Sequence, residues 1–161
     1  ILKYTNPNNT KGTLKTALKN ADVFIGVSQA NQLTTEDVMT MNPQPIIFPL
    51  ANPIPEISPE AAYKGGAGVV GTGRSDIPNQ INNVLAFPGI FKGALEIRAR
   101  RITPRMKVAA AYAIADCVQE LSRDHIIPST LDLNVAKNVA QAVKDAYVED
   151  MKRLETPKHA L

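Results

Sequence analysis

The chain has 161 residues, of which 44% are hydrophobic, and a formal net charge of +3; this length is enough for one domain with a buried core. Its basic residues are spread along the sequence, aromatic residues make up only 5%, and Trp is absent, so we expect no nucleic-acid surface, which would combine clustered basic residues with stacking aromatics. No stretch is long and apolar enough to predict a membrane span.

The first part of the chain alternates between helical and strand patterns. Short helical patterns cover residues 12–19, 34–42 and 58–64, and they alternate with apolar runs at 22–28, 46–50 and 68–72. Thr34 or Thr35 is suited to cap the second helix, whereas Ser58 and Pro59 begin the third and Gly65 ends it. Short apolar runs separated by helices are typical of parallel strands joined by right-handed crossovers.

The second part of the chain is predicted to be helical. Helices are expected over residues 84–98, from a Thr103 cap onward, and from Asn134 to about Met151. The middle helix is predicted to bury an apolar stripe made of Ala110, Ala113, Ile114, Cys117, Val118 and Leu121. The last helix is predicted to turn Ala136, Val139, Ala140, Val143 and Tyr147 inward. We therefore divide the chain into a partial α/β domain, residues 1–98, and C-terminal helices packing on it, residues 99–161.

The glycine pattern of residues 66–71 looks like a dinucleotide-binding turn but stands in the wrong context. Such a turn needs a strand before it and a helix after it, whereas here a helix precedes and Val69 and Val70 are themselves the strand. No other phosphate-binding turn is present, and no acidic residue ends a second strand to read the ribose. The fold class is therefore α/β, the second half of a doubly wound parallel sheet followed by helices, and the start at Ile1 looks internal.

Polar loops follow all three predicted strands. They contain Ser28, Asn52 and the pair Asn82 and Asn83. Because ligands of open parallel sheets bind at the carboxyl ends of the strands, these loops predict one shared small-molecule site. An Asn amide can donate to a carboxylate and accept from a hydroxyl without carrying charge, which suits an oxygen-rich ligand.

Each of these residues also has an ordinary structural role. Asn52 precedes Pro53 and is either a turn residue or a ligand contact. One of Asn82 and Asn83 is expected to cap a helix, while the remaining amides, with Asn79 and Gln80, suit a polar pocket. The Ser28 hydroxyl either contacts a cofactor or bonds the loop backbone.

The charged and nucleophilic residues suggest no reaction centre. Arg74 either clamps a carboxylate or pairs with Asp76 or Glu56. Cys117 is the only cysteine, which excludes an intramolecular disulfide and favours a reducing, cytoplasmic setting; we expect it to be buried. His125 is interpreted as structural. No spacing is typical of a metal site or of an acid–base pair, so we assign no catalytic residue and no metal ligand.

Three segments together resemble one family. Residues 22–28 (DVFIGVS), 51–56 (ANPIPE) and 72–94 (TGRSDIPNQINNVLAFPGIFKGA) resemble the C-terminal part of prokaryotic-type malic enzyme. The resemblance extends through residues 127–129 (IPS) and the closing helices, and the long third segment is the most specific of the motifs.

The resemblance implies a Rossmann-like fold and oxidative decarboxylation of malate to pyruvate and carbon dioxide, with NAD or NADP and a divalent metal, Mg or Mn. It implies that Asn52 contacts both cofactor and substrate, that Asn83 binds malate with Asn82 beside it, and that Ser28 flanks the dinucleotide. We therefore assign Ser28, Asn52 and Asn82 to the cofactor, and Asn52 and Asn83 to the substrate.

The same resemblance implies what other parts of the enzyme supply. The catalytic Tyr and Lys, the metal-binding acids and the Gly-rich turn belong to upstream segments of the family. We accordingly expect this chain alone to be inactive, with the upstream half and a dimer-based homo-oligomer as partners. Two other interpretations stay open at this point: a half-domain of another nicotinamide-dependent dehydrogenase, and a non-catalytic nucleotide-binding or oligomerisation module.

Overall fold

The computed structural model describes residues 4–155. The chain forms two compact units, Ile1–Ile81 and Asn82–Leu161, and each has its own hydrophobic core. Within residues 4–155, every helix is too short or too polar to cross a bilayer.

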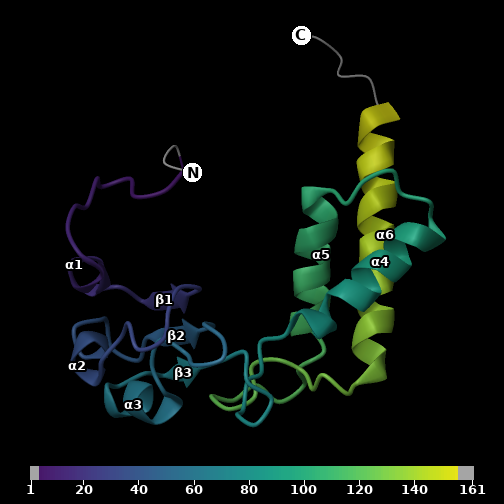
Figure 1. Ribbon diagram of the computed structural model, residues 1–161. Coiled ribbons are helices and arrows are strands. Elements are labelled where there is room, and N and C mark those ends of the chain that lie inside the picture. Colours follow the sequence, from purple (N-terminus) through teal and green to yellow (C-terminus); the bar gives the residue numbers. More distant parts are fainter. Residues whose placement is uncertain (1–3, 156–161) are drawn as a thin grey trace. The chain divides into compact units, whose positions relative to one another are not determined.

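The first unit confirms the predicted alternation of helices and strands (Figure 1). Its elements are α1 (Leu14–Leu18), β1 (Val23–Gly26), α2 (Thr35–Val38), β2 (Ile46–Pro49), α3 (Pro59–Lys64) and β3 (Val69–Val70). The three strands form one parallel sheet in the order β1-β2-β3. Their carboxyl ends therefore lie at the same edge, which brings together the loops that follow β1, β2 and β3.

The short helices of this unit begin and end where the sequence predicts. Thr34 caps α2 in a capping box with Asp37, so of the two candidate threonines the first is the cap. Ser58 caps α3, Pro59 is its first residue and Gly65 its C-cap. Because the side-chain cap satisfies an N–H group that has no partner within the helix, these residues fix the helix starts locally.

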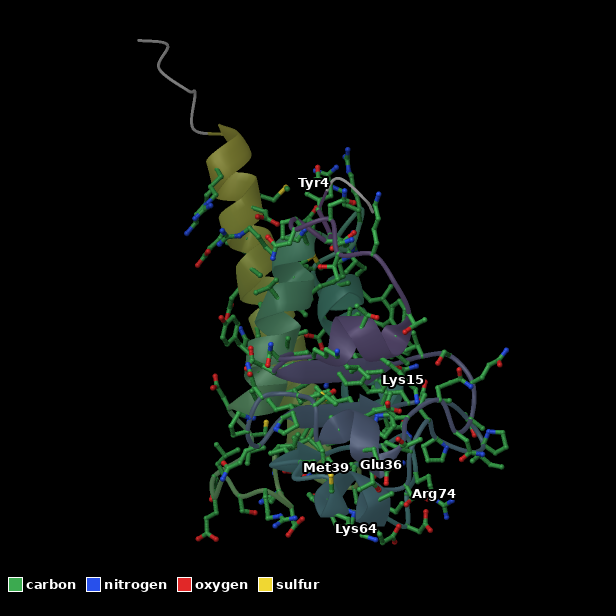
Figure 2. All side chains as sticks on the ribbon, turned by 90° about the vertical axis from the view of Figure 1, so that its left-hand side faces the viewer. Tyr4, Lys15, Glu36, Met39, Lys64 and Arg74 are labelled. Carbon is green, nitrogen blue, oxygen red and sulfur yellow. The ribbon has the colours of Figure 1, made fainter. Side chains whose placement is uncertain are left out.

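Helices α2 and α3 lie together on one side of the sheet (Figure 1), joined where the Thr35 hydroxyl donates to the Ala61 carbonyl (3.1 Å). The core between helices and sheet contains Leu18, Phe24, Leu33, Val38, Met41, Ile47, Ile57, Ala62, Ala67 and Val70. Figure 2 labels Lys15, Glu36 and Lys64, one from each helix, and all three are exposed. Alternate β1 residues, Val23 and Ile25, are 46% and 61% exposed, so one apolar face of β1 is uncovered by the described residues.

The second unit is helical, as predicted. It contains a 3₁₀ turn, η1 (Asn83–Leu85), and the helices α4 (Phe87–Glu96), α5 (Pro104–Ala115) and α6 (Leu133–Glu155). Its core contains Leu85, Ala94, Met106, Ala110, Val135, Val139, Val143 and Ala146. Both α4 and α5 pack on α6, which confirms Val139, Ala140 and Val143 as inward-facing.

Two glycines allow α4 to approach α6 closely. A Cβ at Gly89 would lie 2.6 Å from the Cβ of Val139, and a Cβ at Gly93 would lie 2.5 Å from the backbone oxygen of Ala140. This packing holds α4 in the second unit, whereas the sequence placed the end of the first domain later, after residue 98. The functional division into residues 1–98 and 99–161 stays a prediction.

The predicted stripe on the middle helix is wrong at its C-terminal end. Helix α5 ends at Ala115 with Asp116 as its C-cap, and Leu121 is 77% exposed. An acidic residue is unfavourable at a helix C-terminus because of the helix dipole, and the chain then turns through a short bridge between Ser122 and His125. Cys117, expected to be buried, is only partly buried.

Candidate functional site

The loops that follow β1 and β2 are joined by one buried side chain, Glu56. Its side chain is 0% exposed. The backbone N–H and the hydroxyl of Ser28 donate to Oε1 (2.8 and 3.2 Å), and the N–H of Ala51 donates to Oε2 (3.0 Å). The Ser28 hydroxyl therefore bonds no loop carbonyl but a carboxylate 28 residues further along the chain.

The backbone joins the same two loops a second time. The N–H of Leu33 donates to the Glu56 carbonyl (3.0 Å), and the N–H of Asn31 donates to the Pro55 carbonyl (3.2 Å). Asn31 has a positive φ of 59°, which Asn tolerates better than most residues. The backbone hydrogen bonds and the Glu56 carboxylate together hold the two loops against each other.

Asn52 is an exposed residue of the loop that follows β2. It follows Ala51, and its peptide bond to Pro53 is cis. Its side-chain amide makes no hydrogen bond to any residue that the structure describes. An unengaged amide beside a fixed backbone is able to donate to one ligand oxygen and accept from another.

The loop after β3 is held by its own polar groups. Thr72 is fully buried, and its carbonyl accepts from the N–H of Ile81 (2.7 Å). The buried Asn79 side chain donates to the Val70 carbonyl (3.0 Å). The predicted use of the Asn79 amide in a ligand pocket is therefore wrong, because its donor group supports the strand.

Arg74 in the same loop pairs with Asp76, one of the two structural partners that the sequence allowed. Its Nε and Nη2 donate to the two carboxylate oxygens at 2.9 and 2.6 Å. Hydrogen bonding to Arg74 lowers the pKa of the Asp76 carboxyl. Both residues are exposed, and Glu56 is not a partner of Arg74.

In the second unit the two adjacent asparagines have different roles. The Oδ1 of Asn82 accepts from the N–H of Val84 (3.0 Å) and caps η1, as expected for one member of the pair. Asn83 is the first residue of η1, is exposed, and its side chain bonds no residue of the described chain. The amide of Asn83 is thus available to a ligand, and so is the Nδ2 group of Asn82.

The other candidate residues take ordinary structural contacts. The Nδ1 of His125 lies 3.1 Å from the Glu120 carbonyl, and the Cys117 thiol donates to the Ala113 carbonyl (3.1 Å). Among residues 4–155, no group of three His, Cys, Asp or Glu side chains is placed to hold a metal ion. The described residues therefore do not fit a metal centre.

From the sequence, Glu56 was named as a possible partner of Arg74 and as the last residue of the segment 51–56, but it was given no role in the site. The available signal was an acidic residue between Pro55 and Ile57, in a segment otherwise lacking charge. Burial raises the pKa of this carboxyl, but the hydrogen bonds from Ser28 and Ala51 outweigh it and hold the pKa below its usual 4.5. Glu56 is accordingly ionised at neutral pH.

This pKa shift predicts an acid-dependent loss of stability. A folded-state pKa below the unfolded value contributes stability above that value, and the contribution is lost as the pH falls through the folded pKa. The destabilisation caused by Glu56→Gln should therefore be largest near neutral pH and shrink below the usual pKa of 4.5. Thermal unfolding of the wild type and of Glu56→Gln, from neutral pH to below this pKa, measures the difference in stability. A difference independent of pH would contradict the assignment of an ionised Glu56.

Parallel strands crossed over by helices, with polar loops at their carboxyl ends, define the first unit as a Rossmann-like α/β domain. The family model described as "Malic enzyme, NAD binding domain" matches residues 3–148. The chain belongs to the malic enzyme family and corresponds to part of its NAD-binding region, which confirms the resemblance seen in the sequence.

Individual relatives agree with this assignment. The chain is 56% identical over 151 residues to the bifunctional malic/malolactic enzyme of Bacillus subtilis (strain 168), covering 92% of this chain and 37% of that protein. It is 41% identical over 167 residues to an NADP-dependent malic enzyme of Halomonas elongata, covering 92% and 40%. The chain thus spans well under half the length of these relatives.

Solved structures show the same correspondence. The crystal structure of an NAD-dependent malic enzyme from Thermotoga maritima matches with a TM-score of 0.84 and 51% identity, covering 88% of this chain and 37% of that one. The malic enzyme of Pyrococcus horikoshii matches with a TM-score of 0.86 and 48% identity, covering 95% and 35%.

Proposed function

We propose that this chain is part of a malic enzyme that oxidises and decarboxylates malate to pyruvate and carbon dioxide with NAD or NADP. The observation that carries the proposal is the unengaged amide of Asn52, fixed beside the Ser28 loop by the buried Glu56. The names of the relatives support both cofactors, since NAD-dependent and NADP-dependent enzymes are among them.

The residues of this chain would bind and orient the reactants. Ser28, Asn52 and Asn82 contact the cofactor, and Asn52 and Asn83 contact malate. The cofactor would supply the acceptor for the hydride on the hydroxyl-bearing carbon of malate. Neutral amides suit this position because they hold the malate carboxylate by hydrogen bonds without opposing the cationic ring.

The remaining machinery would come from other parts of the complete protein. We propose that the catalytic Tyr and Lys, the ligands of a divalent metal and the Gly-rich turn lie outside this chain. The uncovered apolar side chains of Val23 and Ile25 support a further layer of the complete protein that covers this face of the sheet. We further propose a dimer-based oligomer and a cytoplasmic setting, the latter supported by the unpaired Cys117.

A substrate panel tests this function on the complete protein that contains the chain. With Mg²⁺ or Mn²⁺ and either NAD or NADP, we expect malate to reduce the cofactor, with lactate and other 2-hydroxy acids far slower. Reduction by another 2-hydroxy or amino acid with inertness to malate would instead support a different dehydrogenase. Absence of turnover with every substrate would support a non-catalytic module.

A further inference from the structure

The two oxygens of the Glu56 carboxylate serve two different loops. Oε1 accepts both donors of Ser28, and Oε2 accepts the N–H of Ala51, the residue before Asn52. Because a carboxylate is rigid and planar, it fixes the separation of the loop after β1 from the loop after β2. A residue with only one accepting oxygen could satisfy one loop but not both.

The backbone of β1 is shaped to receive this carboxylate. A Cβ built on Gly26 would lie 2.4 Å from the Cδ of Glu56 and 2.5 Å from its Oε1. Any side chain at position 26 would therefore displace the carboxylate. Gly26 at the end of β1 thus leaves the space that the carboxylate of Glu56, 30 residues later, occupies.

The charge of Glu56 is not cancelled by a basic side chain. Its hydrogen-bond donors are neutral N–H and O–H groups, and no Lys or Arg among the described residues forms an ion pair with it. A buried negative charge surrounded by dipoles is screened much less than a surface charge. Its field thus acts on whatever the Ser28 and Asn52 loops hold.

We propose that Glu56 is the positioning residue of the nicotinamide site, setting Ser28 and Asn52 relative to each other and favouring the oxidised cofactor by its charge. This inference rests on the proposed function. The oxidised nicotinamide ring carries a positive charge and the reduced ring does not, so a nearby anion stabilises the oxidised form selectively. Loss of positioning alone would weaken both forms equally, which separates the two effects.

The test is cofactor binding by the complete protein and its Glu56→Gln variant, which removes the charge and one accepting oxygen but keeps the size. We expect the Kd of both cofactor forms to rise, and the Kd of the oxidised form to rise about fivefold more than that of the reduced form. The matched control is Asp37→Asn, since Asp37 is also buried and accepts two hydrogen bonds from Thr34. It should leave both Kd values within about twofold of the wild type.

A second variant covers the case in which Glu56→Gln does not fold. Glu56→Asp keeps the charge but is one methylene shorter, so it cannot reach both Ser28 and Ala51. It should weaken both cofactor forms by a similar factor of about five or more. If either variant folds and its Kd values for both cofactor forms are unchanged, the inference is overturned. Equal weakening of both forms by Glu56→Gln would overturn it as well. If the wild-type protein binds neither form, the proposed function itself is wrong.

Discussion

Replacing Asn52 by alanine in the complete protein is expected to lower kcat/KM for malate about 10²- to 10³-fold, a loss of about 3–4 kcal/mol in transition-state stabilisation. The side-chain amide has no partner in the described chain, so its removal costs the fold little. The loss would fall on both reactants, because we assign Asn52 to cofactor and malate alike. Steady-state kinetics with each reactant varied in turn measures this.

Two further variants sharpen the result. Asn83→Ala should raise KM for malate more than KM for the cofactor, since we assign Asn83 to the substrate alone. Asn134→Ala is the matched control: Asn134 is exposed on α6 and its side chain has no partner among the described residues. If Asn52→Ala keeps kcat/KM within about threefold of the control, Asn52 does not contact the reactants.

Replacing Gly93 by alanine is expected to destabilise the second unit by about 2–3 kcal/mol, against the usual preference of helices for alanine over glycine. The added Cβ would lie 2.5 Å from the backbone oxygen of Ala140 and 3.1 Å from its carbonyl carbon. Because these are backbone atoms of α6, no rotamer change relieves the contact, and α4 must move away. Hydrogen exchange of the α4 and α6 amides in the complete protein reports the loss.

The control for this prediction is Gly73→Ala. A Cβ at Gly73 has no atom within 4 Å, so the substitution should change stability by less than about 1 kcal/mol. Propensity alone predicts that Gly93→Ala stabilises α4 by about 1 kcal/mol. Slower hydrogen exchange of the α4 and α6 amides in Gly93→Ala would show that the close contact between α4 and α6 is absent in solution.

The sequence predicted well where local chemistry decides the structure. The order of helices and strands follows from short apolar runs, and the start of α3 follows from Ser58 and Pro59. The capping role of one asparagine at residues 82–83 was anticipated for the same reason. Helix caps are read from three or four consecutive residues, so they need no knowledge of the fold.

Features that depend on distant residues could not be predicted in the same way. The apolar periodicity of α5 continues past Ala115, and only the turn at Asp116 shows that Leu121 is outside the helix. The contact of Gly93 with Ala140 joins residues far apart in the sequence. The role of Glu56 likewise depends on Ser28, 28 residues away, and on space left by Gly26.

The proposed function requires that the amides of this chain contact the reactants of a malic enzyme. A crystal structure of the complete protein with reduced cofactor and tartronate, which is malate shortened by one carbon, tests this most directly. We predict that the side chain of Asn52 lies within hydrogen-bond distance of cofactor and tartronate, and that of Asn83 within hydrogen-bond distance of tartronate. Ligands bound elsewhere, with both amides still facing solvent, would rule out these contacts.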